Sequence, residues 1–474
     1  MPSPLKRSLP LLGLLVLATL LAAPAALRAD DEPQTMSDAV GDGLAKLDPL
    51  LKAKDWTGAL NLVENLVKDA KPDSYDAAIL YRTLAQIDLQ KADYIGAIEP
   101  LEKSLAISDR HHFFSNKETC DLLYIMSEMY YNKADNAKND HDLQVESFDK
   151  AISYIQRWFR LTERPTEDIS MYYAQLLYGA AVARNPQHPD PDLIQKAREQ
   201  VQKTLLMSVH PKDSLYQFLL ATLQQQQDYS GATEVIELLL THNPNNKSYW
   251  QALYGDYMVM AQDPKNKEDV DKVRRMNIRA INTIERAQAL GYLDTPHDNY
   301  TLFTLYYNLG QYGLAADILH KGLSSGGIDS DINNWLLLSA CYQQIDDDFK
   351  SIDALEEATK HFPSNGELES KIAQAYLSLD NNEEALKHAE MALEKGHLTK
   401  PEQTYVFAAY IAYELGKFDE AKEAIEHAVN LMKKPDHQAI GLKTAIEEAI
   451  KERESKKAEK AAEQAQAAAA AKEL

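Results

Sequence analysis

The sequence is poor in cysteine, glycine and positive charge. Two of its 474 residues are cysteine and 18 are glycine, and 72 acidic side chains against 50 basic ones give a formal net charge of −22. The low glycine content excludes a collagen-like chain, and the lack of alternating β-branched runs excludes an all-β chain. Because so acidic a chain repels phosphate backbones, we expect no nucleic acid among its partners. Hydrophobic residues still make up 45% of the chain, which is enough for packed structure.

The sequence also lacks the motifs that carry chemistry. No glycine-rich turn is followed by Lys-Ser or Lys-Thr, and there is no H-E-x-x-H, no paired C-x-x-C and no calcium-binding loop. His111 and His112 lie near Asp109, but adjacent histidines on a helix point about 100° apart and make a poor metal pair. Cys120 and Cys341 are too far apart along the chain for a disulfide in an extended repeat fold. We therefore expect a non-enzymatic protein without a metal or cofactor.

The first 29 residues have the order of a secretory signal peptide. A basic start at Lys6 and Arg7 precedes an apolar stretch from Leu9, and small residues lead to a cleavage point after Ala29. The alternative is an uncleaved membrane anchor, but prolines interrupt the stretch, which favours cleavage. Loss of residues 1–29 removes three basic and no acidic side chains and changes the net charge from −22 to −25. No later stretch is apolar for long enough to span a bilayer, so the sequence predicts a periplasmic protein with no transmembrane span after cleavage.

Ten copies of one spacing organise the rest of the chain. A small residue is followed four positions later by a large apolar or small residue, and three positions after that by a third small or apolar residue. The copies are Ala59/Val63/Leu66, Ala97/Leu101/Ser104, Ala151/Ile155/Trp158, Ala197/Val201/Thr204, Ala232/Ile236/Leu239, Ala280/Ile284/Ala287, Ala315/Leu319/Gly322, Ser351/Leu355/Ala358, Ala385/Ala389/Ala392 and Ala421/Ile425/Ala428. These offsets put all three residues on one helical face, where small side chains let a second helix approach closely.

One copy, together with the residues before it, has the full signature of the tetratricopeptide repeat (TPR). Trp335, Leu338, Ser339 and Tyr342 match W-x2-L-G-x2-Y, and the Ser351 copy follows at the expected distance before Pro363. Turn residues precede several copies, namely Asp55-Trp56, Asp93-Tyr94, Asp228-Tyr229, Gly310-Gln311-Tyr312 and Gly416-Lys417-Phe418. The sequence thus predicts an all-α, right-handed superhelical solenoid of about ten TPR-like helix pairs.

The spacing of the copies predicts the domain boundaries and the insertions. Successive copies lie 34 to 54 residues apart, and the three longest intervals contain polar segments at 132–142, 185–192 and 263–271. We expect these segments to be exposed loops or short helix extensions, either tolerated insertions or docking elements for a partner. The solenoid should cover residues 30–448. Residues 449–474, rich in Ala, Glu and Lys, should form a helical or frayed tail.

A repeat stack of this kind presents surface, and the first helix of each pair lines its concave side. Nine positions on the first helices are candidates for binding a partner through hydrogen bonds and amphipathic contact: Gln217, Gln224, Tyr300, Tyr307, Gln343, Gln344, Gln374, Tyr410 and Tyr413. The alternative is that they are ordinary surface residues. By contrast, Trp250, Trp335, Tyr257 and Tyr342 are expected in the core.

Several segments resemble a bacterial family of exported TPR proteins associated with TonB systems. The resemblance covers roughly residues 37 to 432 and is carried by Ala151-Ile152 through Trp158-Phe159-Arg160-Leu161-Thr162 with Pro165, by Ser248-Tyr249-Trp250-Gln251-Ala252-Leu253, by Gly313-Leu314-Ala315-Ala316 with Gly326-Gly327-Ile328, by Gly366-Glu367-Leu368 with Ala373-Gln374-Ala375-Tyr376-Leu377, and by Ala392-Leu393-Glu394-Lys395-Gly396. The alanine-rich tail and the three insertions depart from the family.

The resemblance implies a periplasmic accessory of the TonB, ExbB and ExbD complex, which drives uptake across the outer membrane. The expected partners are TonB, ExbD or an outer-membrane receptor. The alternative is a TPR adaptor in cell-envelope assembly or polymer export.

Overall fold

A computed structural model describes residues 35–266, 268–434 and 436–470, and within these ranges the chain forms helices and no strand. The predicted signal peptide, 1–29, lies outside the described residues. The chain divides into two compact units, Met1–Pro244 and Asn245–Leu474. The helices of unit 1 are α2 (Asp38–Ala45), α3 (Leu47–Lys52), α4 (Trp56–Asp69), α5 (Tyr75–Gln90), α6 (Ile98–His111), α7 (Asn116–Asn136), α8 (His141–Leu161), α9 (Glu167–Arg184), α10 (Pro191–Leu205), α11 (Asp213–Gln225) and α12 (Tyr229–His242).

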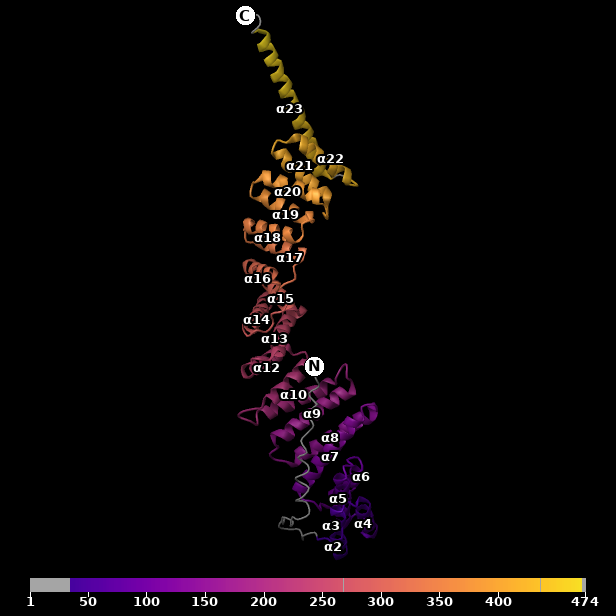
Figure 1. Cartoon of the computed structure of the whole chain (residues 1–474). Coiled ribbons are helices and arrows are strands. Elements are labelled where there is room, and N and C mark those ends of the chain that lie inside the picture. The colour runs from indigo at the N-terminus through magenta and orange to yellow at the C-terminus, as the bar shows by residue number, and fades with distance from the viewer. Residues whose placement is uncertain (1–34, 267, 435, 471–474) are drawn as a thin grey trace. The chain divides into compact units, whose positions relative to one another are not determined.

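The helices of unit 2 continue the alternation of first and second helices (Figure 1). They are α13 (Lys247–Gln262), the short 3₁₀ helix η1 (Pro264–Asn266), α14 (Val270–Ala289), α15 (Pro296–Asn308), α16 (Tyr312–Ser325), α17 (Ile332–Gln343), α18 (Asp348–His361), α19 (Gly366–Ser378), α20 (Asn382–Lys395), α21 (Pro401–Glu414), α22 (Phe418–Leu431) and α23 (His437–Ala470). In each unit, the helices pack mainly on their neighbours in sequence, and α2 packs on α4 as well as on α3. No helix among the described residues is both long and apolar enough to cross a membrane.

The ten predicted copies fall on ten second helices, the even-numbered helices from α4 to α22 or, for Ala97, the residue that caps α6. All thirty positions are buried except Leu66, which is partly exposed. The small residue that begins each copy is fully buried in all ten. The predicted all-α solenoid of helix pairs is therefore confirmed, and burial of these residues against the first helices explains the spacing.

Small polar side chains let the paired helices approach each other closely. The Ser104 hydroxyl donates to the Ala78 carbonyl at 2.7 Å, and the Ser127 hydroxyl donates to the Ala151 carbonyl at 2.9 Å. In each case a buried hydroxyl bonds the backbone of the partner helix, which is possible only where the two helices lie in direct contact.

The turn inside many pairs has a common construction. At seven of these turns in the described chain, a residue with φ between 55° and 72° follows the first helix: Lys54, Ala92, Gln227, Gly310, Asp346, Asp380 and Gly416. In five of them the next residue is Asp or Asn, whose side chain accepts the amide three residues later at 2.8–3.3 Å. In four of the five this is the N-cap interaction, which satisfies a free amide at the start of the second helix, whereas Asp93 caps the turn that precedes α6. The Asp and Gly turn residues of the sequence therefore mark helix starts.

The insertions take three different forms. Residues 132–142 lengthen α7 and α8, each of 21 residues, and leave a short turn between them. Residues 185–190 form a loop before Pro191, the first residue of α10. Residues 264–266 form η1 ahead of α14. The expectation of exposed loops or helix extensions is confirmed.

The last helix that the structure describes is the long α23, which runs on beyond α21 and α22 (Figure 1). Ala439 and Ile446 near its start are fully buried against the last helix pair. Arg453 donates to both carboxylate oxygens of Asp419 on α22, at 2.9 and 2.7 Å. From Glu454 to Gln466 every residue is exposed, because this part of the helix lies past the core and has no apolar stripe to bury.

A buried ion network joins α19 to α20 in unit 2. Glu369, 3% exposed, accepts from Lys395 at 2.6 Å and lies 2.6 Å from Nδ1 of His388, whose ring stacks on Tyr376. Burial raises the pKa of Glu369, but the hydrogen bonds of Lys395 and His388 outweigh it and hold the pKa below its ordinary value. The buried ion pairs of Glu369 thus hold α19 against α20, in addition to the packing of the small alanine side chains.

Candidate protein-binding surfaces

The nine predicted binding residues all lie on or at the end of first helices. Gln217 and Gln224 are on α11 in unit 1, and the other seven are on α15, α17, α19 and α21 in unit 2. Six are exposed: Gln217, Tyr300, Gln343, Gln344, Gln374 and Tyr410. The remaining three, Gln224, Tyr307 and Tyr413, are partly buried.

Of the four tyrosines among the nine predicted binding residues, two pack against a neighbouring aromatic ring and two have rings exposed to solvent. Tyr307 lies 5.2 Å from the ring of Tyr312, and Tyr413 lies 5.8 Å from the ring of Phe418, so both help to hold a second helix. Tyr300 and Tyr410 remain 38% and 43% exposed. An exposed tyrosine offers both ring area and a hydroxyl to a partner at low entropic cost.

Tyr300 lines a cavity of about 280 Å³ between α13, α14 and α15. Its wall consists of Met258, Ala261, Gln262, Val273, Asn277, Tyr300, Thr301, Thr304, Leu305 and Asn308. None of these residues is charged, in a chain whose net charge is −22. An uncharged wall with scattered hydroxyl and amide groups suits an apolar side chain whose backbone needs hydrogen bonds.

The packing of the signature residues decides which kind of helix pair this is. Trp250, Tyr257, Trp335 and Tyr342 are 2%, 2%, 1% and 6% exposed, which confirms their predicted place in the core. They are the large residues of the repeat signature, and Trp335 and Tyr342 share one core cluster with the neighbouring copies that begin at Ala315 and Ser351, through Ala315, Leu319, Leu355 and Ala358. The fold is a tetratricopeptide-repeat solenoid.

Comparisons with solved structures return TPR proteins at low identity. MamA shares 19% identity over 37% of this chain and 90% of its own, with a TM-score of 0.29. YrrB, a TPR protein with an unusual peptide-binding site, shares 14% over 45% of this chain and 100% of its own, with a TM-score of 0.31. A TPR protein from Parabacteroides merdae shares 14% over 57% of this chain and 98% of its own, with a TM-score of 0.25. No protein-family model and no curated protein sequence matches the chain.

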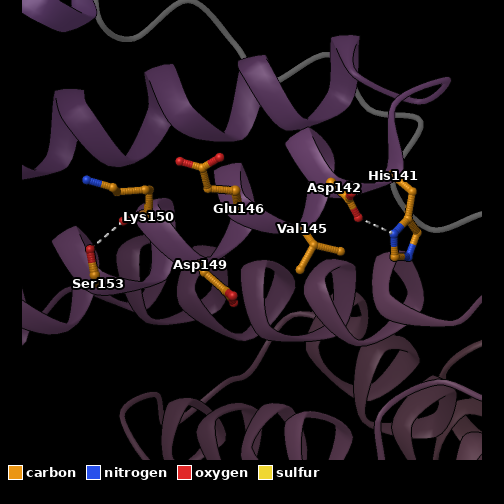
Figure 2. Close-up of a pocket in the computed structure, with 7 residues that line it drawn as sticks. All are labelled: His141, Asp142, Val145, Glu146, Asp149, Lys150 and Ser153. Carbon is orange, nitrogen blue, oxygen red and sulfur yellow. Dashed lines mark hydrogen bonds and ion pairs between the residues drawn. The ribbon is translucent and has the colours of Figure 1, made fainter.

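A wide surface pocket of about 600 Å³ lies on α8 (Figure 2). All seven lining residues belong to this one helix: His141, Asp142, Val145, Glu146, Asp149, Lys150 and Ser153. Figure 2 shows the side chains spread along the helix, with His141 turned to Asp142 at 3.4 Å. No second element closes the pocket within the described residues, so we regard it as an open face of α8.

The residues considered as a metal site have other partners. Both carboxylate oxygens of Asp109 accept from the Arg157 guanidinium, and the ring of His111 stacks on Phe113. His112 ends α6 in the left-handed conformation. Within the described residues no group of three His, Cys, Asp or Glu side chains is placed to hold a metal.

The structure adds a surface that the sequence analysis did not single out. On α7, Asp121, Tyr124, Glu128, Tyr131 and Asp135 follow one another at intervals of three and four residues and so share one helix face. We call these five residues the α7 stripe. Its regular D-x2-Y-x3-E-x2-Y-x3-D pattern is visible in the sequence and is the signal from which the α7 stripe could be predicted. Unlike the three core residues of the repeat spacing, this pattern occurs in one helix and does not recur from pair to pair.

Burial changes the acid–base properties of the α7 stripe. Desolvation raises the pKa of Asp121, and it raises the pKa of Glu128 against the opposing effect of a hydrogen bond from Tyr124. Desolvation is also the main cause of the raised pKa of Tyr131. Among the described residues Asp121 and Glu128 form no ion pair. Asp121 and Glu128 are therefore partly buried carboxylates without an ion-pair partner among the described residues, whereas Asp135 at the end of the α7 stripe is exposed and pairs with Lys138.

Proposed function

We propose that this protein is a non-enzymatic scaffold that binds a segment of a partner protein on the exposed face of its first helices. The observation that carries the proposal is the uncharged cavity beside Tyr300 on α15. The exposed ring of Tyr410 lies on α21, three helix pairs further along unit 2. In a TPR solenoid this face is the concave one, which suits an extended peptide. The absence of catalytic motifs from the sequence supports a binding role over an enzymatic one.

We further propose that the scaffold works in the periplasm as an accessory of a TonB-type energy-transduction system. The signal-peptide pattern of residues 1–29 supports the location, and the resemblance over residues 37–432 supports the association with TonB, ExbD or an outer-membrane receptor. A TPR adaptor for envelope assembly or polymer export would share the same fold, so the partner must decide between the two.

Site-specific photo-cross-linking in cells tests both statements. A benzophenone amino acid replaces Tyr300 in one strain and Tyr410 in a second, and the matched control carries it at Phe349, a 70% exposed aromatic on the second helix α18. After irradiation, cross-linked products are purified through a tag on the chain and identified by mass spectrometry. We expect adducts from Tyr300 and Tyr410 but not from Phe349.

The identity of the adduct separates the outcomes. TonB, ExbD or an outer-membrane receptor supports the TonB assignment, and assembly or export proteins replace it with the adaptor role. Equal adducts at all three positions would show that the first-helix face has no special part in binding. Failure of the tagged chain to appear in a periplasmic fraction would refute the location.

A further inference from the structure

The carboxylates of the α7 stripe repeat at a fixed distance. Asp121, Glu128 and Asp135 are seven residues apart, which is about 10.5 Å along the helix at 1.5 Å per residue. Tyr124 and Tyr131 fall between them with the same period. An acidic group and an aromatic ring therefore alternate along one face over the length of α7.

The surroundings of the α7 stripe supply aromatic rings but little positive charge. Tyr124 and Tyr131 pack on Tyr172 of α9 with ring centroids 5.7 and 6.3 Å away, and Tyr131 also packs on Phe148 of α8 at 6.1 Å. These contacts hold both rings in place. Half-buried carboxylates beside fixed aromatic faces attract ammonium and guanidinium groups through both charge and the ring quadrupole.

The basic residues near the α7 stripe are mostly engaged elsewhere. Arg82 on α5 pairs with Glu118 at 3.4 Å, and Lys212 lies 3.5 Å from Asp168 on α9. Lys138 pairs with Asp135 at 2.9 Å but is itself largely exposed. Lys117 acts on Asp121 from one turn away without forming an ion pair. Asp121 and Glu128 thus keep a desolvation cost that a cation from outside the chain would offset.

We propose that the α7 stripe binds a basic segment of a partner protein, with lysine or arginine side chains placed between the tyrosine rings and against Asp121 and Glu128. In the polyproline II conformation a chain rises about 3.1 Å per residue with three residues per turn, so cations at every third residue share one face and repeat at about 9 Å, close to the carboxylate spacing. This surface lies in unit 1 and is acidic, whereas the cavity beside Tyr300 lies in unit 2 and is uncharged. The two surfaces therefore select different segments.

Fluorescence anisotropy with a labelled (Lys-Ser-Gly)₅ peptide tests the proposal on the full secreted chain at physiological ionic strength. Because the whole protein is acidic, a matched control is essential. The stripe variant is D121N/E128Q, and the control is D142N/E146Q, which removes the same two charges from the exposed face of α8. We expect the stripe variant to weaken binding at least about tenfold and the control by less than about twofold, because charge-assisted contacts in a half-buried site contribute about a factor of ten each.

Further measurements keep the result interpretable. A peptide of the same composition with its five lysines contiguous should bind more weakly than the spaced one. Melting curves should show D121N/E128Q to be at least as stable as the wild type, because neutral amides cost less to bury than carboxylates. The variant Y300A/Y410A should bind the basic peptide as the wild type does, which separates this proposal from the cross-linking result.

Three results would overturn the proposal. Equal weakening by the stripe variant and the control would reduce the binding to overall charge. Unchanged binding by the stripe variant would place the peptide elsewhere. No measurable binding by the wild-type chain in the millimolar range would leave the α7 stripe without this kind of ligand.

Discussion

Replacing Trp335 with alanine should separate the core of the repeat from its binding face. The indole is 1% exposed in the core of unit 2, its ring stacks on His361 at 5.6 Å, and its Nε1 donates to the Ser330 hydroxyl at 3.0 Å. Truncation of a buried tryptophan costs about 3–5 kcal/mol, because it removes apolar burial and leaves a cavity. In a unit of this size each kcal/mol lowers the melting temperature by about 2–4 °C, so W335A should melt roughly 6–20 °C below the wild type.

The matched substitution is Y300A, on the first helix of the preceding pair. Tyr300 is 38% exposed, and its ring makes one tilted contact with Phe303 at 5.5 Å, so its removal should cost about 1 kcal/mol. Melting of both variants is followed by circular dichroism at 222 nm and by tryptophan fluorescence. In a solenoid the loss can be confined to neighbouring repeats, so a broadened transition with an early phase also counts as destabilisation. The assignment of core and face is refuted if W335A has the melting temperature of the wild type, or if Y300A lowers the melting temperature as much as W335A does.

Three further predictions concern unit 2. E369Q should lower the free energy of unfolding at pH 7 by about 3 kcal/mol. Because the pKa of Glu369 is lowered in the folded protein, the wild type should lose this stability as the pH falls below the ordinary value of 4.5. Urea titrations at several pH values should therefore show the free energies of unfolding of the two proteins becoming equal at low pH. G366A should destabilise the unit by about 1–3 kcal/mol, because the added methyl overlaps backbone carbonyl oxygens at the end of α20, whereas G255A, with open space around it in α13, should be neutral or stabilising in the same melts. Truncation after Glu454 should leave the melting temperature unchanged, whereas truncation after Asp436 should lower it, since the described residues from 455 to 466 are all exposed and the second truncation removes the buried Ala439 and Ile446.

The architecture was accessible from the sequence because repetition makes weak signals add up. A buried Ala at one position, such as Ala59 or Ala421, has little meaning by itself, but ten copies in register require the same helix contact each time. The N-cap residues are equally legible, since Asp55 or Asp228 accepts an amide three residues later in the same chain and needs no distant partner. Local and periodic features of this kind can be predicted from the sequence alone.

The surface was less accessible, for a physical reason. Exposed positions carry no packing requirement, so the spacing of the repeat predicts where Tyr300 and Tyr307 lie on the helix but not which ring is free. The structure distinguishes them, because Tyr307 packs on Tyr312 and Tyr300 lines a cavity. The extent of burial on α7 depends in the same way on rings from α8 and α9, which no local pattern reports.

The pattern of contacts between neighbouring helices also shapes how the protein acquires its structure. Within each unit a helix packs mainly on the helices just before and after it, so the contacts between helices mostly join residues a few tens of positions apart. Low contact order of this kind favours fast folding, because little loop entropy is lost before contacts form. A growing chain can pack each new helix on the one already in place. The last of these packing steps is that of α23, which buries Ile446 against the last helix pair.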